Sequence, residues 1–196
     1  HLWKKTLPNG QPTRLTNAAA FEFEASYSSS GKNIVDIEWD DEGGSSLMLA
    51  DSRGQKPKTI TSSTGVIRQP ALSPDGKTLV FVIDEPNKYM GGYRSKSGLY
   101  VVSSSGGTPR LIGARAIAPM YSADGKRIYF SREEGGNTTL SSVNLDGYEP
   151  RDHALATGAD RYELRLSPDG RWLTFKEHQQ YYLMPYVETG NVFDVS

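Results

Sequence analysis

The sequence predicts an all-β fold: a β-propeller of four-stranded blades, about four in number, forming an arc of a larger propeller. One observation behind this prediction is a motif that recurs at the length of a propeller blade. The other is the strand-like patterning between its copies, as in "TLVFVI" (78–83) and "LYVV" (99–102), which are rich in β-branched and aromatic residues. The nearest helical candidate, Ala154–Leu166, is interrupted by Gly158. We therefore expect strands throughout.

The recurring motif has three close copies and one weaker copy. In chain order they read "SSSGKNIVD" (28–36), "SPDGKTLVF" (73–81), "SADGKRIYF" (122–130) and "SPDGRWLTF" (167–175). Their glycines are 45, 49 and 45 residues apart, which is the period expected of four-stranded propeller blades. A second type of hairpin, such as "GLYVVSSSGGTPRLI" (98–112), falls between the copies, so the chain alternates two hairpin types.

The repeat divides the chain into blades within one propeller region over residues 1–196. We expect a blade fragment, three full blades and a partial blade at 1–16, 22–62, 67–112, 116–153 and 162–186. Closing this set into a small propeller would supply the third strand of the last blade twice, so an arc is favoured. An arc leaves the faces and edges of its end blades uncovered. We therefore expect a homodimer that pairs through the end blades.

The residue types in "SPDG" match the demands of a tight turn. Pro74 presets φ for the first central position, Asp75 can accept backbone N–H groups, and Gly76 can adopt the positive φ that a Cβ disfavours. Because Ser30 replaces Asp in the weakest copy, a catalytic role for the motif is not expected. The predicted structural turn residues are Asp75, Gly76, Asp124, Gly125, Asp169 and Gly170.

Composition and motifs exclude several kinds of chemistry. The chain has no cysteine, which excludes thiol catalysis and Cys-ligated metals, and its net charge of -1 does not favour nucleic acid as a partner. No apolar run approaches the roughly 20 residues of a membrane span. The sequence lacks metal-binding histidine spacings, an EF-hand loop, a phosphate-binding loop and a G-x-S-x-G elbow. We expect no catalytic residue, no metal ligand and no cofactor.

Two groups of ionisable residues are interpreted as structural or solvent-exposed and not as functional. The three histidines, His1, His153 and His178, are assigned to surface or packing. The carboxylate pairs at 40–41 and 133–134 fall in predicted turns and are interpreted as solvated loop.

The most distinctive departure from the repeat is the long connection at 84–98, "DEPNKYMGGYRSKSG". It accounts for much of the 49-residue spacing and carries aromatic and cationic side chains suited to holding a partner. The candidate binding residues in it are Tyr89, Tyr93, Arg94 and Lys96. The competing interpretation is a surface insertion without a ligand.

The repeat also resembles a known family. "SPDGK" followed by an apolar strand, and then "LYVV…GG…PRLI", resembles the TolB-like (WD-repeat-like) propeller repeats of bacterial periplasmic proteins over nearly the whole chain. The late repeats, above all "LDGYEPRDHALATG" (145–158), are similar to the propeller that precedes a metal-dependent amidohydrolase domain. In that family the metal ligands belong to the barrel after the propeller, so the resemblance transfers no catalytic residue to this chain.

Two functions remain open. The first is a non-catalytic propeller segment, a scaffold or binding module of an exported amidohydrolase-like protein. The alternative is a protein- or peptide-binding propeller of Tol-type or peptidase-gating kind. A propeller lyase with its own metal is disfavoured because no histidine cluster is present. The partner would be a protein, a peptide or the parent's own catalytic domain.

The resemblance implies a periplasmic or secreted location. The N-terminus "HLWKKTLPNG" lacks the apolar region of a signal peptide. The chain starts inside a strand-like pattern, so we expect it to be an excerpt from a longer protein whose targeting segment is missing.

Overall fold

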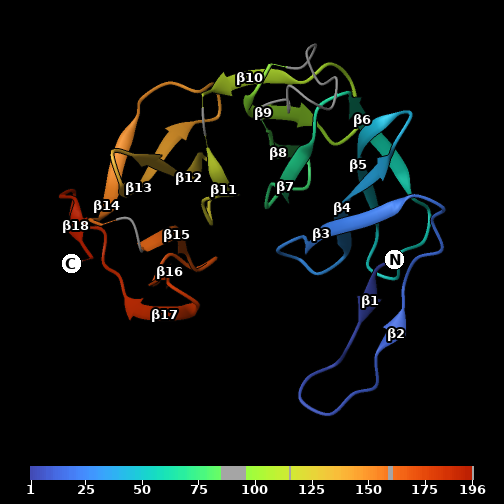
Figure 1. The fold of residues 1–196 in the computed structure, drawn as a ribbon, viewed down its shortest axis with the longest axis horizontal. Helices are drawn as coiled ribbons and strands as arrows, with labels where there is room; N and C mark the ends of the chain where they lie inside the picture. The colour runs from blue at the N-terminus through green and yellow to red at the C-terminus, as the bar shows by residue number, and fades with distance from the viewer. Residues whose placement is uncertain (85–95, 115, 159–160, 196) are drawn as a thin grey trace. The chain divides into compact units, whose positions relative to one another are not determined.

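The regular structure of this chain consists of strands. The computed structural model describes residues 1–84, 96–114, 116–158 and 161–195, and this part of the chain contains strands β1 to β18 and no helix (Figure 1). None of its segments is therefore a helix that could cross a membrane. The chain divides into two compact units, His1–Arg110 and Leu111–Ser196.

The first unit contains a short hairpin and two four-stranded antiparallel sheets. The hairpin is β1–β2, the next sheet has the order β3-β4-β5-β6, and the following sheet has the order β10-β9-β8-β7, with β10 crossing the boundary of the units. The strands are β1 (Trp3–Lys4), β2 (Thr13–Arg14), β3 (Phe21–Tyr27), β4 (Asn33–Asp40), β5 (Gly44–Asp51), β6 (Lys58–Ser63), β7 (Ile67–Leu72), β8 (Thr78–Ile83), β9 (Gly98–Ser103) and β10 (Arg110–Gly113).

The second unit contains two further sheets, of orders β11-β12-β13-β14-β18 and β15-β16-β17. Its strands are β11 (Ile117–Tyr121), β12 (Arg127–Glu134), β13 (Asn137–Asn144), β14 (Arg151–Ala156), β15 (Arg161–Leu166), β16 (Trp172–Glu177), β17 (Gln180–Pro185) and β18 (Phe193–Asp194). The predicted fold class is confirmed, because successive strands pair in order into sheets of the propeller-blade type. The arc, the single region over 1–196 and the blade bounds within it stay predictions.

The core of the first unit lies between its two large sheets. Val35 and Ile37 of β4 and Leu79 and Phe81 of β8 are fully buried or nearly so in one apolar cluster, and Phe81 stacks on Tyr100 with 5.7 Å between ring centroids. Complete burial of such a side chain contributes about 1.5–3 kcal/mol. β8 is buried on both faces, so its sequence reads as an unbroken apolar run rather than an alternation.

The core of the second unit is closed by the C-terminal segment, which the sequence analysis did not assign to a strand. β18 pairs in parallel with β14, and the Val195 N–H donates to the Leu155 carbonyl at 2.9 Å. Val195 and Tyr186 are buried in the same cluster as Leu164 and Leu173. A two-residue parallel strand has no local sequence pattern, which is why the sequence did not predict it.

Each large sheet begins with the same hairpin. In the second sheet the Ser73 Oγ accepts the Thr78 N–H at 3.0 Å and donates to the Asp75 Oδ1 at 2.7 Å, while Asp75 also accepts the Lys77 N–H at 3.0 Å. Gly76 has a φ of +73° and donates its N–H to the Ser73 carbonyl at 2.9 Å. The turns with Asp124, Gly125, Asp169 and Gly170 repeat these bonds.

The first strand of each large sheet also carries a bulge that the sequence analysis did not predict. Four non-glycine residues, each seven positions before the glycine of its turn, have positive φ values of 49° to 57°: Glu24, Gln69, Ala118 and Glu163. The strand register shifts at each of them, so one extra residue is accommodated in the first strand. The repeat therefore fixes a bulge as well as a turn.

The weak fourth copy of the turn offers a test of its chemistry. Ser30 stands where the other copies have Asp, and its Oγ lies 3.2 Å from the Ser28 Oγ and 3.4 Å from the Lys32 nitrogen. We expect Ser30→Asp to shorten both hydrogen bonds by supplying a charged acceptor, and to raise the thermal midpoint by about 1–3 °C. Thermal unfolding by circular dichroism measures this, with Asp75→Ser expected to lower the midpoint. A Ser30→Asp variant less stable than the parent would contradict the role of the carboxylate.

Candidate functional site

The predicted binding residues lie at the connection between β8 and β9. Tyr89, Tyr93 and Arg94 fall outside the described residues. Lys96 is exposed near the C-terminal end of the connection, where its carbonyl accepts a hydrogen bond from the Tyr100 hydroxyl at 2.6 Å. The six predicted turn residues lie in the hairpin turns described above, where they bond backbone groups.

The N-terminal end of this connection, at Asp84, is held by an ionic network. The Arg68 guanidinium donates to the Glu24 Oε1 through Nε at 2.8 Å and Nη2 at 2.5 Å, and to the Asp84 Oδ2 at 3.1 Å. Glu24 in turn accepts the Gln69 N–H at 2.5 Å. The hydrogen bonds that Arg68 donates to Glu24 raise the pKa of Arg68. The two bulges of the first unit are thereby tied together where the connection starts.

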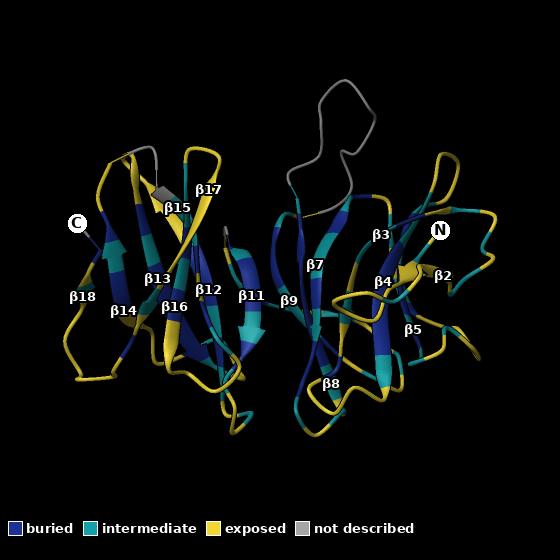
Figure 2. Ribbon diagram, turned by 90° about the horizontal axis from the view of Figure 1, so that it is seen from below, coloured by how far each residue is buried: buried dark blue, intermediate teal, exposed yellow. Residues whose placement is uncertain are grey.

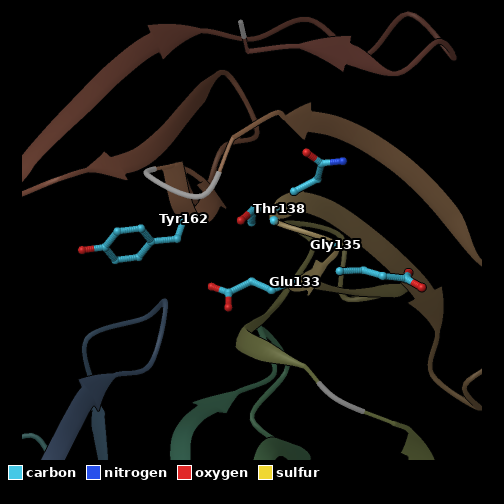
Figure 3. A pocket seen from close by; sticks show the side chains of 7 residues that line it. Glu133, Gly135, Thr138 and Tyr162 are labelled. Carbon is cyan, nitrogen blue, oxygen red and sulfur yellow. The ribbon is translucent and has the colours of Figure 1, made fainter.

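A polar pocket of about 410 Å³ lies beside the turn between β12 and β13. Figure 3 shows Glu133, Gly135, Thr138 and Tyr162 among the residues that line this pocket. Glu133 and Glu134 are exposed, and no described residue forms a hydrogen bond or ion pair with either carboxylate. Tyr162 is anchored by donating its hydroxyl to the His178 carbonyl at 2.9 Å. The carboxylate pair predicted to be solvated loop thus forms one wall of a pocket.

His153 lies in a buried chain of polar groups that resembles a catalytic triad. Its Nε2 is 2.7 Å from the Ser142 Oγ, and its Nδ1 is 2.8 Å from the Glu188 Oε2. Ser142 has no exposed surface, however, and its Oγ already accepts the Arg127 Nε–H at 2.8 Å. A substrate cannot reach this hydroxyl, so the chain of bonds holds β13, β14 and the residues after β17 together.

Three carboxylates that the sequence pattern does not single out form a cluster in the first unit. Glu22 of β3 lies directly opposite Glu38 of β4, and Asp36 is two residues away on the same face. One oxygen from each of the three lies within 4.8 Å of the others. The Glu22 Oε2 accepts the Thr16 hydroxyl at 2.6 Å and lies 3.4 Å from the His1 Nδ1.

This acidic cluster opens into a cavity of about 340 Å³. The cavity is covered by the segment before β3 and by the β5–β6 turn, and its lining residues are Leu15, Thr16, Asn17, Ala18, Glu22, Asp36, Glu38, Met48, Ala50, Gly54, Gln55 and Pro57. Asp36 is only 4% exposed. Burial, together with the charges of Glu22 and Glu38, raises the pKa of Asp36 to about 7. Burial and Glu22 also raise the pKa of Glu38.

The repeat itself contains the signal that could have identified this cluster. Asp36 is the last residue of "SSSGKNIVD", and the other three copies of the motif end in phenylalanine, at Phe81, Phe130 and Phe175. All three phenylalanines are buried. An aspartate at a position that is otherwise an apolar core residue indicates a local requirement other than packing.

Comparison with known proteins places this architecture among TolB-like propellers. No protein-family model and no curated protein matches the sequence. TolB from Acinetobacter baumannii is similar in structure over 88% of this chain and 42% of its own, with a TM-score of 0.68 and 18% identity. Oligogalacturonate lyase from Vibrio parahaemolyticus is similar over 93% and 56%, with a TM-score of 0.66 and 13% identity.

Hydrazine synthase from Kuenenia stuttgartiensis is similar over 90% of this chain and 33% of its own, with a TM-score of 0.70 and 15% identity. The chain thus spans less than two thirds of the length of each of these proteins. The shared property is the fold, a TolB-like β-propeller, and the resemblance expected from the sequence is confirmed at that level.

The raised pKa of Asp36 predicts a pH dependence of stability. Between the ordinary aspartate pKa of 3.8 and the folded value of about 7, the folded protein holds a proton that the unfolded chain has released. The free energy of unfolding therefore falls as pH rises through this range, and the penalty is complete above pH 7. Asp36→Asn stays neutral at every pH, so we expect it to lose less stability than the parent between pH 4.5 and pH 8.

Chemical denaturation at the two pH values, in the presence of a chelator, measures this difference. Asp41→Asn, an exposed carboxylate on the β4–β5 turn, is the control and should behave as the parent does. Equal losses of stability in the parent and in Asp36→Asn would contradict the assignment of a buried, repelled carboxylate.

Proposed function

We propose that this chain is a non-catalytic β-propeller module that binds a protein or peptide segment. The observation that carries the proposal is the pocket beside the β12–β13 turn, whose lining combines two carboxylates without partners among the described residues and an anchored aromatic ring. This turn joins the second and third strands of its sheet, as the long connection at 84–97 does in the sheet before it. Loops of this kind on a rigid scaffold are frequent sites of recognition.

The chemistry of the pocket favours a basic peptide. Glu133 and Glu134 offer acceptors to Lys or Arg, and the ring of Tyr162, whose centroid lies 5.2 Å from the Lys176 Nζ, offers apolar contact beside that ammonium. Gly135 and Gly136 form the tip of the turn, where no side chain obstructs the approach of an extended backbone. A short segment with one or two cations beside an apolar residue fits this combination.

The wider setting of the module is a further part of the proposal. The similarity of residues 145–158 to a propeller that precedes an amidohydrolase domain supports an exported, amidohydrolase-like parent, in the periplasm or secreted. In that setting the partner would be the parent's own catalytic domain. The alternative, a Tol-type or peptidase-gating propeller that binds a separate protein, is supported by the TolB-like fold.

The last sheet supports self-association through an end blade. β17 pairs with β16 alone among the described strands, and it is largely exposed (Figure 2). Trp172, Tyr181 and Leu183 lie on one face of this sheet and are 40%, 73% and 62% exposed. A second copy that adds its own end strand would cover both the strand edge and these exposed side chains.

Peptide binding can be tested with fluorescence anisotropy on a set of labelled peptides that differ in charge. We expect Lys- or Arg-containing peptides to bind, and the double variant Glu133→Gln/Glu134→Gln to weaken binding at least tenfold, about 1.4 kcal/mol. The control is Asp146→Asn/Glu149→Gln, which removes the same charge at the turn between β13 and β14, at the opposite end of the hairpin. Binding that does not depend on Glu133 and Glu134 would remove this pocket from the proposal.

Self-association can be tested by light scattering coupled to size-exclusion chromatography. We expect a dimer at micromolar concentration and a shift to monomer in Leu183→Lys, because the new charge would be buried in the interface. Val187→Lys, which changes an exposed residue just after β17, is the control and should remain dimeric. A parent chain that elutes as a monomer over the micromolar range would refute pairing through the end blade.

A further inference from the structure

We propose that Glu22, Asp36 and Glu38 form a binding site for one divalent cation, and that Ca²⁺ fits it best. The site belongs to the first unit and is separate from the peptide pocket, so this proposal does not depend on the proposed function. All three ligands are carboxylate oxygens, which favour hard cations such as Ca²⁺, Mg²⁺ and Mn²⁺ over metals that prefer sulfur or imidazole.

The spacing of the cluster matches a shared ion. Two oxygens bound to the same Ca²⁺ at about 2.4 Å each lie at most about 4.8 Å apart. One oxygen from each of Glu22, Asp36 and Glu38 lies within 4.8 Å of the other two. Mg²⁺ demands near-ideal octahedral geometry and keeps several of its waters, whereas Ca²⁺ accepts six to eight oxygens in a flexible arrangement, so a cavity with several protein oxygens suits Ca²⁺ better.

Asp36 is a mostly buried residue that faces the cavity. Its residue surface is 96% buried, it lines the cavity, and no described residue donates a hydrogen bond or forms an ion pair to it. Buried carboxylates are normally paired, hydrogen-bonded or bound to metal. No Lys or Arg is among the residues that line the cavity, and the His1 Nδ1 lies 3.4 Å from the Glu22 Oε2.

The rest of the cavity can complete the coordination. Ca²⁺ takes six to eight oxygen ligands, including amide oxygens and waters. Asn17 and Gln55, which carry side-chain amides, are among the residues that line the same cavity, and its volume of about 340 Å³ leaves room for water molecules. Glu22 is already oriented by the Thr16 hydroxyl at 2.6 Å, which leaves its other oxygen available.

A bound ion would also connect the segment before β3 to the sheet. Thr16 and Asn17 cover the cluster from that segment, while Asp36 and Glu38 project from β4. In the other copies of the motif the position of Asp36 is a buried phenylalanine that stabilises by packing. Here an ion held among carboxylates would take the place of that apolar contact.

Calorimetric titration of the chelator-treated chain of 196 residues with CaCl₂ tests the site. We expect one Ca²⁺ per chain, and a rise in the thermal midpoint with Ca²⁺ concentration, since a ligand bound by the folded state stabilises it. Asp36→Asn and Glu38→Gln should each weaken binding at least tenfold, and each keeps the shape of the side chain so that the fold is retained.

The control is the double variant Asp41→Asn/Glu42→Gln, which removes two exposed carboxylates from the β4–β5 turn and should bind Ca²⁺ as the parent does. Absence of binding up to about 1 mM Ca²⁺, the weak end of protein sites, would overturn the proposal. Binding that is unchanged in both Asp36→Asn and Glu38→Gln would overturn it too, because the ion would then lie elsewhere. Tighter binding of Mg²⁺ than of Ca²⁺ would overturn the choice of ion.

Discussion

The hydroxyl of one serine in each blade is the contact on which the rest of the sheet depends. The Oγ of Ser73 accepts the N–H of the residue that starts the second strand, so the register of the first hairpin is set at its turn. The glycine of the turn and the bulge seven residues earlier recur with the same spacing in the four sheets of three or more strands. With register and bulge fixed, the apolar faces of successive strands align and the cores of both units can pack.

In a repeat of this kind, the positions that build the scaffold can be distinguished from the positions that form binding sites. Positions that serve the turn or the core carry similar residues from blade to blade, whereas the two candidate sites lie where the blades differ. The acidic cluster depends on an aspartate at a position that is otherwise phenylalanine, and the polar pocket depends on two glutamates and two glycines at one turn. The buried Ser142–His153–Glu188 chain shows that triad-like distances alone do not make an active site, since access is also required.

The sequence predicts the period, the strands and the turns well because each has a local physical signature. The bulges are not predictable in the same way, since Glu24 and Ala118 are not residues that favour positive φ, and the tertiary pairing imposes it. The β14–β18 pairing joins distant segments and has no local pattern. The acidic cluster was missed because Glu22 and Glu38 alternate with apolar residues, a pattern typical of a solvent-facing strand.

The central claim is that the binding sites of this propeller lie at positions where one blade differs in sequence from the others. Anomalous diffraction from crystals grown with Mn²⁺ as a Ca²⁺ substitute tests it most directly. The account predicts one strong peak among the carboxylates of Glu22, Asp36 and Glu38, within about 2.6 Å of each. No such peak in the first sheet, or a peak only at the regular SPDG turns, would contradict it.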